Sequence, residues 1–209
     1  MTYSVEDLND QERFRLILTI SYKDLIPFIL EYLKKKSGLT ILYWATCLAF
    51  LLISVFIRIK IAGYYPVSQI LMHSLAGFVI LPLLCIPVHE LLHIIPYYLS
   101  GAKDIRVGMD LKQYLFYVSA NRYVASPVQF RVVAITPFIL ISSGVILTVI
   151  FLPDLWKWSM MLFLFVHATM CAGDIALLNF YRVNDHKRIY TWDDVDNKEA
   201  YFYEKLEIE

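Results

Sequence analysis

Two histidines and a glutamate lie inside a long apolar run, in the stretch IPVHELLHIIP. His89 and His93 are four positions apart, so on a helix both imidazoles project from one face and can bind one metal ion. Glu90 follows His89 directly and could take the proton of an attacking water without being a ligand itself. The motif predicts the metal centre of a zinc hydrolase, with His89 and His93 as ligands and Glu90 as general base.

Zinc hydrolases commonly use three protein ligands. A metzincin pattern would need glycine and histidine where this chain has Pro96 and Leu99, and the first glutamate after the motif is Glu199, near the C-terminus. Asp174 is the stronger candidate because it is an isolated acid in a later apolar run, where an unpaired charge is costly. It and His93 each lie eight residues before the end of their run, on the order of 12 Å below one membrane interface.

Several interpretations of these polar residues stay open. The motif could be a polar pair that helps helices pack, and Asp174 could bond another polar group without metal. His167, two helical turns before Asp174, could be a packing residue, an outer hydrogen-bond partner or a spare ligand. Gly173 is expected to let helices approach closely. Pro87 and Pro96 bracket the motif, so we expect a locally opened helix there.

Four apolar segments are long enough to cross a bilayer. The second is too long for one straight crossing, and Pro82 and Pro87 inside it are expected to kink it or split it into two helices. The segments cover about 39–57, 67–99, 132–152 and 158–181. The fold class predicted is therefore an α-helical integral membrane protein with about four transmembrane helices.

Basic residues indicate the orientation of these segments. They concentrate before the first segment, in the loop 101–131 and after the fourth segment, and are sparse on the other side. This predicts a multi-pass protein of the cell membrane with both termini in the cytoplasm. The predicted parts are a cytoplasmic N-terminal segment 1–38, a membrane domain 39–181 and a cytoplasmic tail 182–209.

The flanking segments carry weaker patterns. Residues 14–21 are typical of a strand, and 21–36 of an amphipathic helix capped by Ser21 with Asp24 completing a capping box. In the loop, two short strands bracket the polar stretch LKQ and predict a small hairpin at the membrane surface. The tail from Arg182 could add one strand.

Composition narrows the function classes. The chain has 209 residues, 58% of them hydrophobic and 18% charged, which is too apolar for an ordinary soluble domain. A formal net charge of zero gives no general attraction to nucleic acid. Cys47, Cys85 and Cys171 each lie in an apolar run, so we expect no disulfide framework.

These residues resemble a known family. HELLH in one span and Gly173-Asp174-Ile175 in a later one are similar to the intramembrane zinc metalloproteases of the site-2 protease type, although those carry Asp-Gly in the opposite order. The order of HELLH, a strand-like YVSA, a proline-bearing ITPFIL and then GDI more closely resembles a bacterial multi-pass group of zincin peptidases. The resemblance covers roughly residues 65 to 205 and implies a metallopeptidase.

The expected function is a zinc-dependent intramembrane endopeptidase whose substrates are membrane-embedded or membrane-adjacent protein segments. The alternative is a non-enzymatic membrane protein, either a proton or metal-ion carrier or a regulatory scaffold with a degenerate site, because proton relays also use intramembrane His, Glu and Asp. The sequence names neither the substrate nor the oligomeric state.

Overall fold

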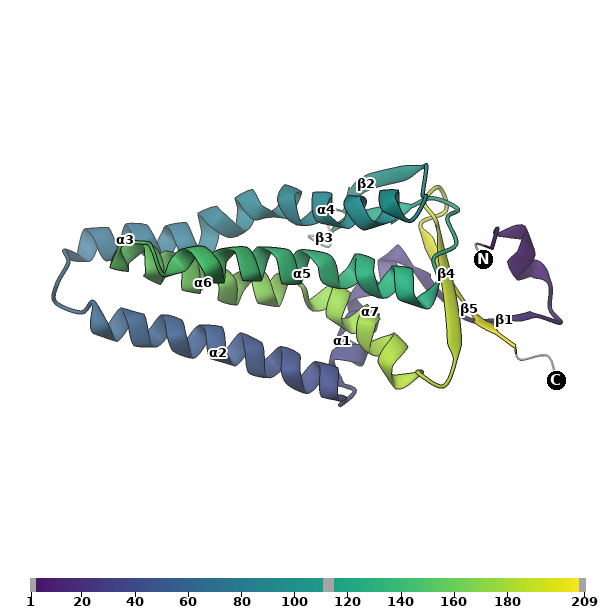
Figure 1. Cartoon of the computed structure of the whole chain (residues 1–209), viewed down its shortest axis with the longest axis horizontal. Coiled ribbons are helices and arrows are strands. Elements are labelled where there is room, and N and C mark those ends of the chain that lie inside the picture. The colour runs from purple at the N-terminus through teal and green to yellow at the C-terminus, as the bar shows by residue number, and fades with distance from the viewer. Residues whose placement is uncertain (1–2, 111–114, 207–209) are drawn as a thin grey trace.

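A computed structural model describes residues 3–110 and 115–206 of the chain (Figure 1). Long helices run side by side along the molecule, and a small sheet closes one end. Both chain ends lie at the end that carries the sheet. The loops that join α2 to α3 and α5 to α6 lie at the opposite end.

Three helical runs in the described residues are long and apolar enough to cross a membrane, and a fourth qualifies if a bent pair of helices counts as one span. In the three single runs, only 22–28% of the most apolar window is buried against the rest of the protein. The other side chains of these windows are exposed or half-buried, which suits contact with lipid. The runs are α2 (Gly38–Lys60), α3 to α4 (Val67–Leu99), α5 (Pro127–Val149), and the pair α6 (Asp154–Met170) and α7 (Ala172–Val183), bent by 49°.

The second run, predicted to kink or to split at Pro82 and Pro87, stays helical throughout and is not split into separate spans, although a π-helical segment interrupts the α-helix before Pro82. It consists of α3 (Val67–Leu75), a π-helical segment (Ala76–Ile80) and α4 (Leu81–Leu99). Proline lacks the N–H that an α-helical bond needs, and the wider π turns directly precede Pro82, so the ladder adjusts there without breaking.

The N-terminal segment and the tail join in one antiparallel sheet. Strand β1 (Phe14–Ser21) is the strand predicted there, and the tail supplies two strands instead of one, β4 (Arg188–Asp194) and β5 (Glu199–Lys205). Their order is β1-β5-β4. A second strand forms because the turn between β4 and β5 lets the aromatic side chains of the tail pair across strands, as Trp192 and Tyr201 do with stacked rings.

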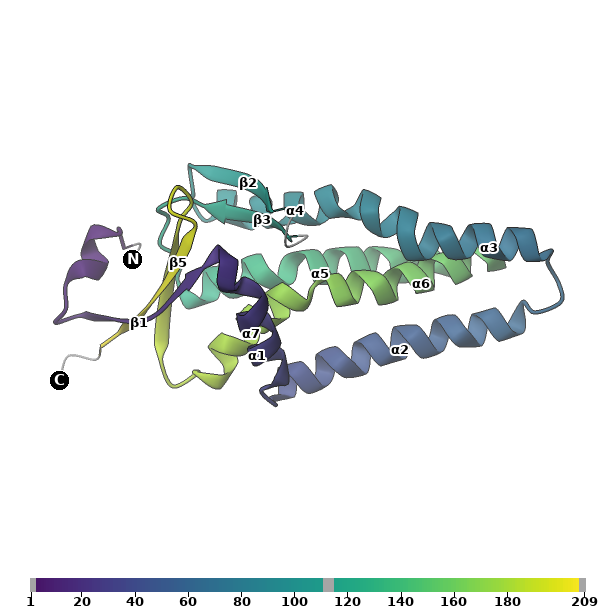
Figure 2. The ribbon, with the colours of Figure 1, turned by 180° about the vertical axis from the view of Figure 1, so that it is seen from behind.

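The loop 101–131 contains the predicted hairpin, with β2 (Ile105–Asp110) antiparallel to β3 (Leu115–Ala120). The stretch LKQ, residues 111–113, lies outside the described residues. Figure 2 shows the hairpin beside α4. Its strands are short and form a sheet separate from β1-β5-β4.

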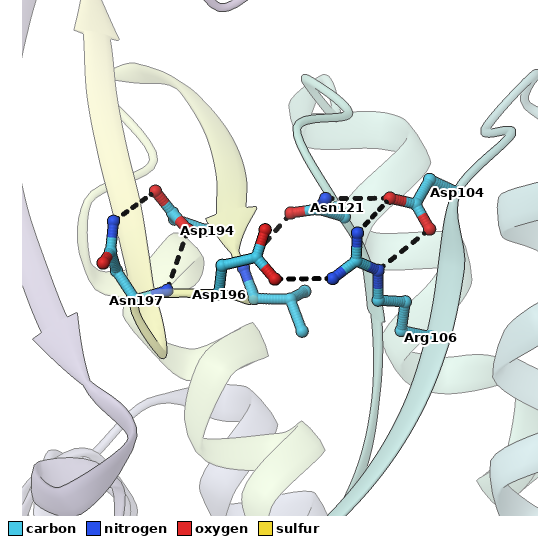
Figure 3. Close-up of polar contacts among 7 residues, drawn as sticks. Asp104, Arg106, Asn121, Asp194, Asp196 and Asn197 are labelled. Carbon is cyan, nitrogen blue, oxygen red and sulfur yellow. Dashed lines mark hydrogen bonds and ion pairs between the residues drawn. The ribbon is translucent and has the colours of Figure 1, made fainter.

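Arg106 ties this hairpin to the turn between β4 and β5 (Figure 3). Its guanidinium donates two hydrogen bonds to Asp104, at 3.0 and 2.8 Å, and one to Asp196 at 2.7 Å. Asn121 donates to Asp104 and accepts from the Val195 amide, which extends the same network. The Arg106 guanidinium, together with Asn121, holds the pKa of Asp104 below its usual value.

The predicted cap of the N-terminal helix is wrong. A short 3₁₀ turn, Tyr22–Asp24, precedes α1 (Leu25–Lys34), and neither Ser21 nor Asp24 makes a side-chain cap hydrogen bond. A 3₁₀ helix, Glu6–Asn9, lies before β1. Capping boxes form instead at the start of α2, between Ser37 and Thr40, and at the start of α5, between Ser126 and Gln129.

Candidate metal centre

The motif histidines lie on the inner face of α4. His89 and His93 are 6% and 7% exposed, and their ring centroids are 5.0 Å apart. The helix runs unbroken past Pro87 and Pro96, so the expected local opening is wrong. Leu91 and Ile95, which are 57% and 50% exposed, lie on the outward side of the same helix.

Asp174 reaches these histidines from α7. Its Oδ2 atom is 3.2 Å from His89 Nε2, and its Oδ1 atom is 3.5 Å from His93 Nε2. One ligand atom from each of the three residues lies within 4.8 Å of the others, so the set could hold one ion. Asp174, the acid selected by its depth in the apolar run, therefore lies next to the motif in the structure.

The bend between α6 and α7 brings Asp174 into place. The helix breaks at Cys171, and Asp174 lies in the first turn after the break, where free backbone N–H groups favour a negative charge. Gly173 does not provide the close helix approach that we expected, because a β-carbon there would make only an ordinary 3.6 Å contact with Ile29. The close approach of helices occurs instead at Gly77.

Each motif histidine has its second ring nitrogen facing another group. His93 Nδ1–H donates to the carbonyl oxygen of Val133 on α5 at 2.9 Å, so in the neutral ring Nε2 is the nitrogen that can bind a metal. His89 Nδ1 lies 3.4 Å from Nε2 of His167 on α6. Cys171 completes a second group that could hold an ion, formed by His89, His167 and Cys171.

Glu90 contributes no atom to either group within the described chain, although it is the neighbour of His89. It lines two cavities at once. One, of about 340 Å³, extends from the motif toward the sheet, and the other, of about 490 Å³, lies between α4 and α6. A carboxylate beside the ligands and open to two cavities can exchange protons with a water or a substrate there.

The far wall of the smaller cavity is polar. The hydroxyls of Tyr22 and Ser119 are hydrogen-bonded at 2.9 Å, and Asp193 of β4 faces the same space. Enclosure by protein raises the pKa of Asp193 from its usual value near 3.8 to about 7, while a hydrogen bond from Ser119 acts in the opposite direction. Sequence reasoning missed Asp193, because a tail aspartate among other acids shows no sign of burial.

The remaining histidine of the second run serves another contact. His73 Nδ1 is hydrogen-bonded to Ser159 at 2.9 Å, and its ring meets the edge of Trp156. His73 therefore lies in the packing between α3 and α6 and outside the group of residues at the motif. The donor set of two imidazoles and a carboxylate at the motif is one that catalytic zinc sites use.

A protein-family model matches residues 82–186, and the family is described as "putative zincin peptidase". The match spans half of the 209 residues and includes the motif and Asp174. The chain belongs to this family. Membership supports a peptidase and implies zinc as the cofactor of this zincin-family chain, and the two groups above are able to hold the ion. None of the curated proteins matches the chain, and no solved structure does.

Proposed function

We propose that this zincin-family chain is an intramembrane zinc endopeptidase in which His89, His93 and Asp174 hold the ion and Glu90 is the general base. One observation carries the proposal: the Nε2 atoms of both motif histidines lie within 3.5 Å of one carboxylate from a distant helix. The Val133 carbonyl supports it, because it orients His93 for metal binding.

The residues of the chain divide the reaction between them. A bound zinc ion would supply Lewis-acid chemistry, polarising a peptide carbonyl and lowering the pKa of water. Glu90 accepts the proton of the attacking water and passes a proton to the leaving amine. His89 and His93 hold their rings fixed on a rigid helix, and burial of this face limits the water that reaches the reacting atoms.

The substrate is a membrane-embedded or membrane-adjacent segment of a protein. The larger cavity supports this proposal, because its walls are apolar apart from the motif residues themselves, as a lipid-side entrance requires. Phe116 of the hairpin lines both cavities, so strand β3 lies beside the route between them. An extended substrate could pair with this hairpin, which would expose its peptide bonds after local unwinding.

The resemblance to site-2-type proteases agrees with this location at the membrane. The helix runs would cross the bilayer with the sheet, the hairpin and both termini on one side, which the basic residues assign to the cytoplasm. The metal centre would then lie in the cytoplasmic half of the bilayer.

Zinc analysis of the purified chain in detergent tests the assignment. Wild type should hold one zinc ion per chain, and His89→Ala and Asp174→Ala should lose it. His186→Ala, a matched removal of an exposed histidine outside both groups, should keep it. Equal zinc content in all four proteins would refute the ligand set.

The role of Glu90 needs a separate measurement. Glu90→Gln should retain zinc but lose hydrolysis of membrane-protein substrates, and it should therefore trap uncut substrate for identification by mass spectrometry. Undiminished hydrolysis by Glu90→Gln would contradict the mechanism. Glu90-dependent ion flux in proteoliposomes, without any hydrolysis, would replace it with the carrier function.

A further inference from the structure

In both His89 and His93, one ring nitrogen is directed at Asp174 and the other at a neighbouring group. Each turns Nε2 toward Asp174 and Nδ1 away from it. Behind His93 the acceptor is a backbone carbonyl at 2.9 Å. Behind His89 the neighbouring group is the Nε2 atom of His167 at 3.4 Å. A metal-binding imidazole needs such a partner, because the hydrogen bond at one nitrogen fixes which nitrogen is free for the metal.

The surroundings of His167 fix its ring. The residue is fully buried, and its ring stacks on Phe138 with centroids 6.5 Å apart and an interplanar angle of 13°. Phe163 lies against it at 5.9 Å. Its Nδ1 atom has no hydrogen-bond partner within the described residues, and its Nε2 atom faces His89. The polar contacts of the ring are therefore all at Nε2, which lies 3.4 Å from His89 Nδ1 and 3.7 Å from Cys171 Sγ, a weak hydrogen-bonding group.

The protons can be placed by elimination. A metal on His89 Nε2 leaves the ring proton on Nδ1, and that N–H requires an acceptor. Cys171 Sγ, at 4.0 Å, is more distant and is a weak acceptor. His167 can accept only if its own Nε2 is bare, so its proton must lie on the buried Nδ1. That N–H has no hydrogen-bond partner within the described residues, which costs free energy.

We propose that His167 is a positioning residue of the zinc site, a neutral imidazole that accepts the His89 Nδ1–H hydrogen bond and so holds His89 Nε2 toward the metal. The inference rests on the ligand set proposed above. In this arrangement His167 is neither a metal ligand nor a residue that only packs. Removal of such outer partners typically weakens metal affinity about 10- to 100-fold.

The competing arrangement places the ion on the other side of His89. There the group His89, His167 and Cys171 would bind it through Nδ1, Nε2 and Sγ. In that case His167 and Cys171 would be ligands, and His93 and Asp174 would not. The two arrangements make opposite predictions for Cys171 and His93, so one set of variants separates them.

Zinc affinity by chelator competition, in the full chain in detergent, gives the first readout. His167→Phe should weaken zinc about 10- to 100-fold, whereas His167→Gln, whose amide oxygen can accept the same hydrogen bond, should bind nearly as tightly as wild type. Cys171→Ala should match wild type, and His93→Ala should lose the ion. Wild-type affinity in His167→Phe would overturn the proposal, as would zinc binding that depends on Cys171 but not on His93.

Two spectroscopic readouts do not depend on a variant's folding or on catalysis. In the zinc-loaded wild type, ¹⁵N spectra of labelled histidine should show His167 with a bare Nε2 and a protonated Nδ1. The reverse tautomer would refute the proposal. Cobalt in place of zinc should show no thiolate-to-metal charge-transfer band, and such a band would favour the competing site. Failure of wild type to bind any metal would instead refute the proposed function itself.

Discussion

The Nε2 atom of His89 and the Oδ2 atom of Asp174 lie 3.2 Å apart although 85 positions separate the two residues in the chain. One residue belongs to α4 and the other to the first turn of α7. Their distance therefore depends on how α4, α6 and α7 are held together. Two contacts outside the metal centre help to fix these helices, one between the second helical run and α6 and one between α7 and the segment that joins α1 to α2, and each can be tested separately.

The first contact is the crossing at Gly77, where a β-carbon would overlap the carbonyl oxygen of Ser159 and lie 2.9 Å from its Cα. Gly77→Ala should force the second helical run away from α6 and cost about 1–3 kcal/mol of unfolding free energy, because backbone atoms cannot yield. Thermal unfolding in detergent measures the loss.

Gly144→Ala is the matched control. A β-carbon there meets nothing within 4 Å, and the residue lies in the interior of α5. The substitution should raise the free energy of unfolding by about 0.5–1 kcal/mol through helix propensity. Equal effects of the two substitutions would mean that the close crossing at Gly77 is not formed.

The second contact is Asn179, a fully buried residue of α7. Its amide donates to the carbonyls of Tyr32 and Lys35 at 2.7 and 2.9 Å and accepts from the Ser37 hydroxyl at 2.6 Å. Asn179→Ala should lower the free energy of unfolding by about 2–4 kcal/mol, because it leaves buried partners unsatisfied. Denaturant unfolding should show this loss, and Asn197→Ala, at an exposed turn, should show little change. An unchanged free energy of unfolding in Asn179→Ala would contradict the stabilising role of this contact.

Some parts of this arrangement could be predicted from the sequence, and the reason is physical. An acid in an apolar run is costly, so Glu90 and Asp174 stood out, and a period of four residues placed both histidines on one face. The strand 14–21 and the hairpin carried alternating patterns bounded by turn residues. The expected depth in the membrane then linked His93 and Asp174, which no local sequence pattern connects.

Other parts depend on three-dimensional packing and left no local signal. The π segment before Pro82 and the close crossing at Gly77 depend on where α6 lies. Asp193 is enclosed only because the tail folds back over the hairpin and α4. His167 could be placed on the face of Asp174 from its spacing, but its partner on α4 could not.

Asp193 should make stability depend on pH. Its folded-state pKa of about 7 lies above its ordinary value near 3.8, so the folded state binds more protons between these values. The contribution of Asp193 to the free energy of unfolding is then fully present below about pH 4 and is lost as pH rises through about 7. The loss is at most on the order of 4 kcal/mol. Asp193→Asn should therefore gain stability relative to wild type as pH rises.

Unfolding temperatures of the two proteins at about pH 5 and pH 8 measure this effect. The unfolding temperature of Asp193→Asn, relative to that of wild type, should be higher at the higher pH than at the lower pH. Asp185→Asn, an exposed aspartate on the turn after α7, should show no such trend. A difference that stays constant with pH would contradict the enclosure of Asp193.

X-ray absorption at the zinc edge tests the metal centre most directly, because it reports the atoms that bind the ion. The ligand set His89, His93 and Asp174 predicts nitrogen and oxygen neighbours at about 2.0–2.2 Å, with the imidazole scattering of two histidines. The spectrum should be unchanged in Cys171→Ala. A sulfur neighbour at about 2.3 Å that disappears in Cys171→Ala would contradict the account, because it would place the ion between His89, His167 and Cys171.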